Sequence, residues 1–152
     1  MSHITLAINA GSSSLKTTLF FEDTIQQTLR RLASAEISAI NQPPAKLKYK
    51  RGEYRDFSEL DKITDHRSAF EHVLNAFISD ELIPEVKSKT DIKYACHRVV
   101  QGGDFADDEL LTRETFNKIQ ALSDLAPLYG HCGSPISPRV TNLVIVDTMP
   151  PR

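Results

Sequence analysis

The chain has few cysteines, no long apolar run and almost no excess of either charge. Cys96 and Cys132 lie in different kinds of segment and lack metal-ligand spacing, so a reducing compartment fits them best. No apolar stretch approaches the length of a membrane span, and the N-terminus lacks a basic segment followed by an apolar run. We therefore expect a cytoplasmic protein with no membrane partner.

Charge and composition narrow the class of protein further. The formal net charge of −2 predicts no electrostatic capture of nucleic acid, but it leaves room for a local basic site that binds a phosphorylated ligand. The five histidines form no paired zinc motif, so most are expected to be surface or structural residues. With 152 residues, 40% hydrophobic and 25% charged, the chain has the composition of one soluble globular domain.

The most informative stretch runs from Ile4 to Leu19, where apolar and polar residues alternate on both sides of a polar loop. This period of two predicts two strands joined as an antiparallel hairpin. The loop, Asn9 to Ser14, is called the glycine-serine loop below. It contains Gly11, which permits left-handed backbone angles, and three serines that offer hydroxyls beside free backbone N–H groups. With Lys16 just beyond it, the loop is chemically suited to hold phosphate oxygens.

Two observations bear on that interpretation. The loop does not fit the GxxxxGK[ST] phosphate loop, because a strand rather than a helix follows it and the spacing differs. Glycine and serine also dominate ordinary turns, so a plain turn between two strands is the structural alternative.

Strands are also expected through the next third of the chain. The segment from Thr24 to Ile40 fits either a helix or a strand, because its apolar residues match both periods. Lysines alternate with apolar residues from Lys46 to Lys50, and an extended piece through Phe57 follows, which predicts a hairpin. Its lysines are expected to form a solvated face or to protect an edge strand, with a binding patch as the alternative.

Helices and buried strands alternate further along the chain. Apolar residues at helical spacing predict a helix over 64–83, closed by Pro84. The segment from Ile92 to Val100 is apolar on both faces, which predicts a central strand covered by helices. The remaining predictions are a helix from Thr112 to Ala126, a loop from Tyr129 to Thr141 and a buried strand from Leu143 to Val146.

Arg98 is the second candidate for chemistry. It stands near the carboxyl end of the predicted central strand, where open α/β sheets bind ligands. Its planar guanidinium can hold a carboxylate or a phosphate in two-point contact. A salt bridge with a nearby acid is the structural alternative.

Three motifs resemble those of acetate kinases and occur in that family's order. The segment Asn9 to Lys16 resembles the N-terminal signature. His97 to Gly103 resembles the motif that carries the substrate arginine, with Gln101 in place of the usual histidine. Leu125 to Leu128 resembles the family's LAPL segment.

The resemblance implies a fold and a division of the chain. The fold is α/β, the ribonuclease-H-like N-terminal domain of the acetate and sugar kinase, Hsp70 and actin group, with a mixed sheet flanked by helices. Residues 1–128 form the acetate kinase-like domain, and a third strand lies near Gln27 to Leu32. Residues 129–152 form a divergent tail with one strand, and the second domain of the kinase is absent.

The resemblance also implies how a nucleotide and a metal bind. Asn9 helps to hold Mg²⁺. Ser12, Ser14 and Lys16 face the phosphates of ATP or ADP. All four residues belong to the segment Asn9 to Lys16 that resembles the family's N-terminal signature.

For the acyl substrate, the resemblance implies that Arg98 grips the carboxylate. Val100 and Leu128 match positions that line a pocket for the methyl group of acetate, with plain core packing as the alternative. Asp147 follows a strand that resembles the one carrying the family's catalytic aspartate, with an aspartate at an ordinary turn as the alternative. The motifs do not determine the length of the acyl chain, because propionate and butyrate kinases have similar motifs.

The family reaction is reversible transfer of the γ-phosphoryl group of ATP to acetate, giving acetyl phosphate and ADP. A carboxylate is already ionised at pH 7, so the acceptor needs alignment and positive charge rather than a strong base. Two hypotheses remain: a kinase that needs residues from a partner, or a non-catalytic half-domain that binds phosphate or pairs with a full-length homologue or a second copy. We expect the chain alone to show only background activity.

Overall fold

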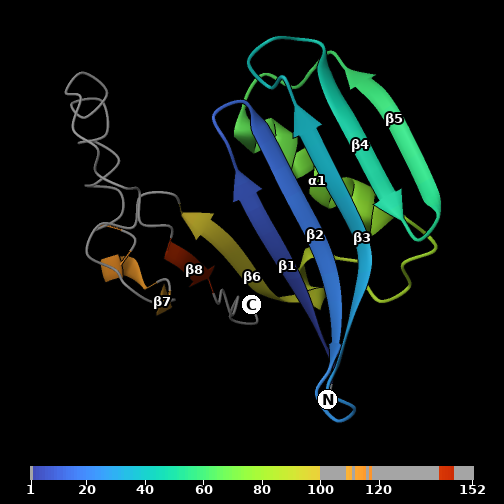
Figure 1. Cartoon of the computed structure of the whole chain (residues 1–152), viewed down its shortest axis with the longest axis vertical. Coiled ribbons are helices and arrows are strands. Elements are labelled where there is room, and N and C mark those ends of the chain that lie inside the picture. The colour runs from blue at the N-terminus through green and yellow to red at the C-terminus, as the bar shows by residue number, and fades with distance from the viewer. Residues whose placement is uncertain (1, 100–108, 111, 116, 118–140, 146–152) are drawn as a thin grey trace.

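The computed structural model describes residues 2–99, 109–110, 112–115, 117 and 141–145 (Figure 1). These residues form one mixed sheet with the strand order β5-β4-β3-β2-β1-β6-β8-β7. No helix within them is long and apolar enough to cross a membrane. The elements are β1 (Ser2–Ala10), β2 (Ser14–Asp23), β3 (Thr28–Ser38), β4 (Ala45–Arg51), β5 (Tyr54–Leu60), α1 (His66–Ser79), the 3-10 turn η1 (Lys89–Asp91), β6 (Ile92–Val99), β7 (Glu109–Leu110) and β8 (Thr141–Ile145).

The first five strands follow one another as an antiparallel meander. Each pairs with its successor, and β6 returns beside β1 in the parallel sense after the crossover through α1. The predicted hairpin from Ile4 to Leu19 and the predicted hairpin around Gly52 are both confirmed. The ambiguous segment from Thr24 to Ile40 is the strand β3, which is longer than the predicted Gln27 to Leu32.

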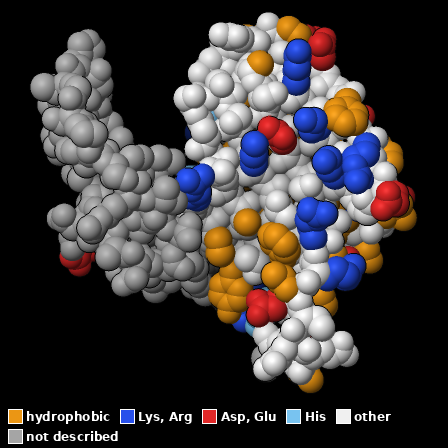
Figure 2. Space-filling view, viewed as in Figure 1, with side chains coloured by type: hydrophobic (Ala, Val, Ile, Leu, Met, Phe, Trp, Pro, Cys, Tyr) orange, Lys and Arg blue, Asp and Glu red, His pale blue; other side chains and the backbone are white. Residues whose placement is uncertain are grey.

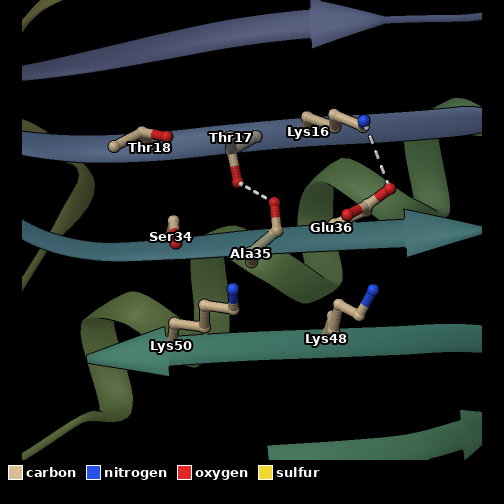
Figure 3. Close-up of a pocket in the computed structure, with 8 residues that line it drawn as sticks. All are labelled: Lys16, Thr17, Thr18, Ser34, Ala35, Glu36, Lys48 and Lys50. Atoms are coloured by element: carbon tan, nitrogen blue, oxygen red, sulfur yellow. Dashed lines mark hydrogen bonds and ion pairs between the residues drawn. The ribbon is translucent and has the colours of Figure 1, made fainter. Parts of the chain in front are cut away.

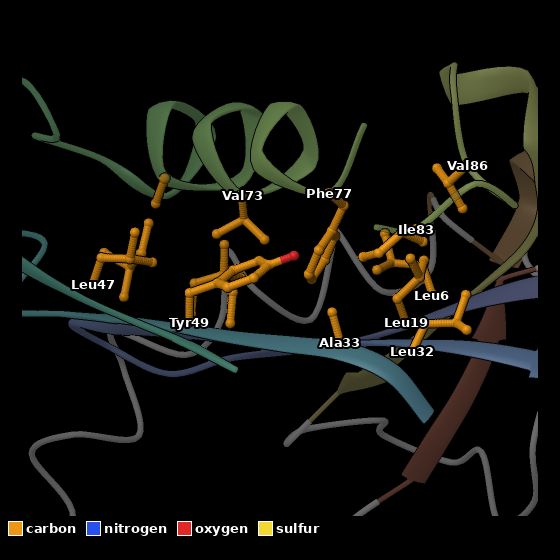
Figure 4. Close-up of a cluster of buried hydrophobic side chains, with 14 of the residues drawn as sticks. Leu6, Leu19, Leu32, Ala33, Leu47, Tyr49, Val73, Phe77, Ile83 and Val86 are labelled. Atoms are coloured by element: carbon orange, nitrogen blue, oxygen red, sulfur yellow. The ribbon is translucent and has the colours of Figure 1, made fainter. Parts of the chain in front are cut away.

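One face of the sheet, called the inner face below, carries the core. Alternate residues of the meander point toward α1, among them Leu6, Leu19, Ile37 and Leu47, and all are at least nine-tenths buried. Figure 1 shows α1 lying across this face behind β2, β3 and β4. In Figure 4, Phe77 descends from α1 among the strand side chains. The period-2 pattern read from the sequence therefore marks the face that α1 covers.

Helix α1 begins at a strong cap. The Asp65 carboxylate accepts a hydrogen bond from the Ser68 N–H at 2.7 Å, and the Ser68 hydroxyl lies 3.3 Å from the Asp65 N–H, which completes a capping box. The helix ends at Ser79, so the predicted end near residue 83 is wrong. Pro84 does not close it, because Asp80 already adopts an extended conformation and its carboxylate is bound by β4 side chains.

The last third of the chain is described only in short segments. The strand predicted from Ile92 to Val100 is β6, and its side chains from Tyr94 to His97 are partly rather than fully buried. The last predicted strand is β8. Of the helix predicted from Thr112 to Ala126, residues 113–115 and 117 are helical, Thr112 precedes them, and residues 116 and 118–126 lie outside the described residues. Residues 129–140 of the loop predicted from Tyr129 to Thr141 also lie outside them, and the predicted end of that loop is wrong because Thr141 begins β8.

Candidate functional site

The glycine-serine loop is held by its carbonyl groups. The Gly11 carbonyl accepts a hydrogen bond from His66 Nε2 at 2.6 Å, and the Ser12 carbonyl accepts one from the Asn41 amide at 3.1 Å. The Ser13 carbonyl accepts from the Ile40 N–H at 3.1 Å. The Ser14 carbonyl accepts from the Gly11 N–H at 2.8 Å. The four consecutive carbonyls from Gly11 to Ser14 therefore each accept a hydrogen bond from the protein.

Because its carbonyls bind protein donors, the loop turns its N–H groups the other way. Within the described residues, the N–H groups of Ser12 and Ser13 have no acceptor, and both residues are exposed. Successive outward N–H groups beside serine hydroxyls form a concavity that attracts anions. The sequence suggested donors at this loop, and the geometry leaves two of them open to a ligand.

Gly11 lies close to the side chain of Ser14. A methyl group added at its Cα would lie 2.8 Å from the Ser14 Oγ. Real side chains do not pack so closely, so any larger residue would displace the Ser14 hydroxyl from its present position. The glycine thus lets the Ser14 hydroxyl keep its present position.

Three predicted site residues share one row across the sheet. Asn9 is the partner of Lys16 on β2 and of Arg98 on β6, so their side chains emerge on the same face, opposite α1 and called the outer face below. Glu36 of β3 continues the row beyond Lys16. We call Arg98, Asn9, Lys16 and Glu36 the site row. The register thus brings together residues that lie 89 positions apart.

A shallow hollow adjoins this row on the outer face. It measures about 210 Å³, and in Figure 3 the side chains of Lys16, Glu36, Lys48 and Lys50 surround it while α1 lies behind the sheet. Figure 2 shows that basic side chains gather over this face. The lysines predicted as a solvated face are exposed there, on β4, which is an interior strand and not an edge.

The row carries two basic side chains, Arg98 and Lys16, and one acidic side chain, Glu36. Lys16 Nζ lies 3.4 Å from Glu36 Oε1, and the two side chains are 58% and 35% exposed, so solvent screens the pair and it orients Lys16 more than it stabilises the fold. Arg98 is also exposed. Its neighbour His97 points to the inner face, where burial lowers the pKa of the imidazole and a hydrogen bond with the Arg98 backbone offsets this only in part.

The described part of the chain offers few side chains that could bind a metal ion. No three His, Cys, Asp or Glu side chains come together there in a way that could hold an ion. Asn9, the predicted metal contact, can offer a single amide oxygen. Mg²⁺ in nucleotide sites keeps several waters and is bound largely by substrate phosphates with one or two protein ligands, usually carboxylates, so the Asn9 amide oxygen fits at most one contact to a nucleotide-bound Mg²⁺.

The other predicted site residues cannot be placed. Val100, Leu128 and Asp147 lie outside the described residues, so their roles remain predictions. Conversely, sequence reasoning missed His66 and Asn41, which hold the glycine-serine loop from α1 and from the β3–β4 connection. The sequence carries no local signal for either contact, because both partners lie far from the loop along the chain.

Comparisons with known proteins agree on one family. Residues 4–144 match the model of the Acetokinase family. A probable acetate kinase of Neurospora crassa is 38% identical over 154 residues, covering 96% of this chain and 30% of that protein. A propionate kinase of Yersinia enterocolitica is 38% identical over 133 residues, covering 85% of this chain and 31% of that protein. The chain thus spans about a third of the length of the curated relatives it matches.

Solved structures confirm the predicted fold. The crystal structure of Porphyromonas gingivalis acetate kinase superposes with a TM-score of 0.69 at 24% identity, over 94% of this chain and 37% of that one. A propionate kinase from Francisella tularensis gives a TM-score of 0.65 at 22% identity. The α/β fold expected from the three motifs is therefore the fold observed.

Proposed function

Because the chain belongs to the acetokinase family, we propose that it carries one half of a site for phosphoryl transfer between ATP and acetate or another short-chain carboxylate. The observation that carries the proposal is the loop geometry. Four carbonyls of the glycine-serine loop are bound by protein donors, and the Ser12 and Ser13 N–H groups are left open beside Lys16.

The loop binds the phosphates of the nucleotide. The two outward N–H groups and the hydroxyls of Ser12 and Ser14 donate to phosphate oxygens, and Lys16 adds a positive charge. Glu36 orients the Lys16 ammonium from 3.4 Å away without burying it. Asn9 would offer one oxygen to a Mg²⁺ ion that accompanies the nucleotide, and such an ion would supply positive charge for phosphoryl transfer.

Arg98 binds the carboxylate acceptor. It stands in the site row with Asn9 between it and Lys16, so the acceptor and the phosphates meet over adjacent strands. An ionised carboxylate attacks without losing a proton, and the chain's own residues act by holding and aligning the two anions. Val100, Leu128 and Asp147 are proposed to complete the site as the family motifs imply.

Binding and catalysis can be tested separately on the 152-residue chain. We expect ADP with Mg²⁺ to shift the NMR signals of the Ser12 and Ser13 amides, and Lys16→Ala to weaken binding about tenfold, as loss of a charge-assisted contact should. Lys46→Ala is the matched control, since Lys46 is an exposed lysine on a different strand. Absence of any amide shift at millimolar ADP would overturn the proposal.

A non-catalytic, phosphate-binding half-domain is the second candidate. It is favoured by the position of the site row on an open sheet face, with Arg98 exposed to water. Acetyl hydroxamate formation from ATP, Mg²⁺ and acetate, run beside Arg98→Ala, separates the two. We expect equal backgrounds, which exclude independent catalysis, whereas activity that disappears in the variant would eliminate the second candidate.

A further inference from the structure

Lys48 and Lys50 of β4 are basic side chains that the proposed nucleotide site does not use. Both are exposed, and both line the shallow hollow on the outer face. Within the described part of the chain neither ammonium forms an ion pair, and Lys48 Nζ lies 6.0 Å from the centroid of the Phe57 ring. Two unpaired ammonium groups on one side of a hollow attract an anion.

Two hydroxyl groups lie beside these lysines. Thr18 of β2 is opposite Ser34 of β3, and Ser34 is opposite Lys50, so the three side chains share one row on the outer face. Thr18 and Ser34 are partly buried, and no described residue forms a hydrogen bond with either hydroxyl. In Figure 3 the Lys50 side chain reaches toward β3 near Ser34. The hollow thus has four side-chain donors from three strands.

Glu36 places one acceptor among these donors. It lies opposite Lys16 on β2 and opposite Lys48 on β4, and its Oε1 atom is 3.4 Å from Lys16 Nζ. An ionised carboxylate has about four lone-pair positions, so Glu36 can accept a further hydrogen bond. It repels an anion bound beside it unless that anion carries a hydrogen that it can donate. The hollow should therefore prefer anions that have an O–H group.

Size and charge together identify the class of ligand. The hollow measures about 210 Å³, roughly the share of liquid volume that seven water molecules occupy, which suits a small ion. At about pH 7.5, inorganic phosphate is mainly a dianion that retains one O–H group. Sulfate has no O–H group at that pH, and neither does a phosphate monoester, whose second pKa is about 6.

We propose that the hollow is a second anion site and that it selects inorganic phosphate. The ammonium groups of Lys48 and Lys50 balance the two negative charges. The hydroxyls of Thr18 and Ser34 donate to phosphate oxygens. The O–H group of the phosphate donates to the Glu36 carboxylate, which turns a repulsive neighbour into a hydrogen-bond partner.

This site is separate from the loop proposed to hold the nucleotide phosphates. Thr18 lies four residues along β2 from Ser14, which corresponds to about 13 Å in a strand. Lys16 lies between them and borders both sites. The inference does not require nucleotide binding, and Lys50→Ala should leave ADP binding unchanged. Absence of phosphate binding beside intact ADP binding would therefore be a failure of this inference alone.

The test is a set of NMR titrations of the 152-residue chain at constant ionic strength and about pH 7.5. We expect sodium phosphate to shift the backbone amide signals of Ser34 and Lys50 until they saturate. Sodium sulfate should bind about tenfold more weakly, because it offers Glu36 no hydrogen bond. Glycerol phosphate should behave like sulfate, which distinguishes free phosphate from phosphorylated metabolites as the ligand.

Three variants sharpen the test, and circular dichroism verifies that each is folded. Lys50→Ala should weaken phosphate binding about tenfold through loss of a charge-assisted contact. Lys46→Ala is the matched control, since Lys46 is an exposed lysine on the same strand and face that does not line the hollow. Glu36→Gln should raise the affinity for sulfate to about that for phosphate, because an uncharged amide can donate to either anion.

Several results would each overturn the proposal. Phosphate-induced shifts confined to residues 11–14 would mean that phosphate binds only the glycine-serine loop. Equal affinity of the parent chain for phosphate and sulfate would mean that Glu36 selects nothing. Equal weakening by Lys46→Ala and Lys50→Ala would mean that the anion is attracted by the basic face as a whole and has no defined site.

Discussion

The inner and outer faces of the meander are made from alternate residues of the same strands, yet one face is buried and the other is exposed to solvent. On the inner face, Leu19 and Ile37 are fully buried beneath α1. On the outer face, Lys16 and Glu36 of the same two strands are partly exposed beside a shallow hollow (Figure 3). Apolar burial stabilises the first face, whereas the second keeps charged groups available to a ligand.

Along each strand, the buried residues that hold the backbone in place alternate with the exposed residues that a ligand can reach. A side chain on the outer face is positioned by a backbone that the inner face holds in place. Substitutions on the inner face should therefore change stability, and those on the outer face or in its loop should change binding. Four predictions test that division, in order of decreasing effect.

Phe77→Ala should cause the largest loss of stability. Phe77 is fully buried between α1 and the strands (Figure 4), and truncating such a side chain costs about 3–5 kcal/mol through lost burial and the cavity left behind. Urea denaturation measures the change. Leu82→Ala, at a position that is 71% exposed, should stay within about 0.5 kcal/mol. Equal losses of stability in Phe77→Ala and Leu82→Ala would contradict the expected difference between buried and exposed residues.

Asp80→Asn should cost about 1–3 kcal/mol, because it weakens a cluster at the end of α1. The Asp80 carboxylate accepts from the Tyr49 hydroxyl at 2.7 Å and pairs with Arg51. Burial raises the pKa of Asp80, but the hydrogen bonds from Tyr49 and Arg51 outweigh it, so the pKa lies below its usual value. Burial and Asp80 raise the pKa of Tyr49, whose phenol therefore remains a donor.

The pH dependence of this cluster follows from the sign of the shift. A depressed folded-state pKa means that the Asp80 contribution is fully present above the unfolded-state value of about 3.9 and is lost as pH falls through the lower folded-state pKa. The stability difference between the parent and Asp80→Asn should therefore begin to narrow as pH falls below about 4 and should close once pH lies below the folded-state pKa. A gap that stayed constant to lower pH would contradict this account.

Gly11→Ala should weaken ADP binding about tenfold while changing stability little. The added methyl group would meet the Ser14 hydroxyl at 2.8 Å and move a phosphate donor, and one charge-assisted hydrogen bond is worth about that factor. Gly52→Ala is the reciprocal control. Gly52 has open space around it but a φ of 54°, so alanine should cost about 1 kcal/mol of stability and leave binding unchanged. Isothermal titration calorimetry measures ADP binding and urea denaturation measures stability for both variants.

His66→Ala should have the smallest effect, about a threefold weakening of ADP binding, because it removes one neutral hydrogen bond to the Gly11 carbonyl. A carbonyl only accepts, so His66 donates from Nε2, and His66→Gln retains an amide donor that can restore part of the affinity. His72→Ala, on the same helix, serves as the control. Weakening by His72→Ala and not by His66→Ala would show that α1 acts through another contact.

Much of the fold could be predicted from local pattern. The alternation around the glycine-serine loop predicted the β1–β2 hairpin, and the spacing of Ala69, Val73 and Phe77 predicted α1. The end of α1 could not be predicted, because Asp80 is bound by side chains of β4 that lie about thirty residues earlier in the chain. For the same reason the pattern between Thr24 and Ile40 stayed ambiguous until pairing with β2 and β4 made it a strand.

For the site, the sequence by itself determined which groups are available: a glycine followed by three serines, a lysine beyond them and an arginine near the end of a later strand. Only the tertiary structure decided how they are used. Register placed Arg98, Asn9 and Lys16 in one row, and His66, Asn41 and Ile40 occupied the loop carbonyls so that its N–H groups face outward. The physical reason is that residue type is local, whereas register and hydrogen-bond partners depend on segments distant in the chain.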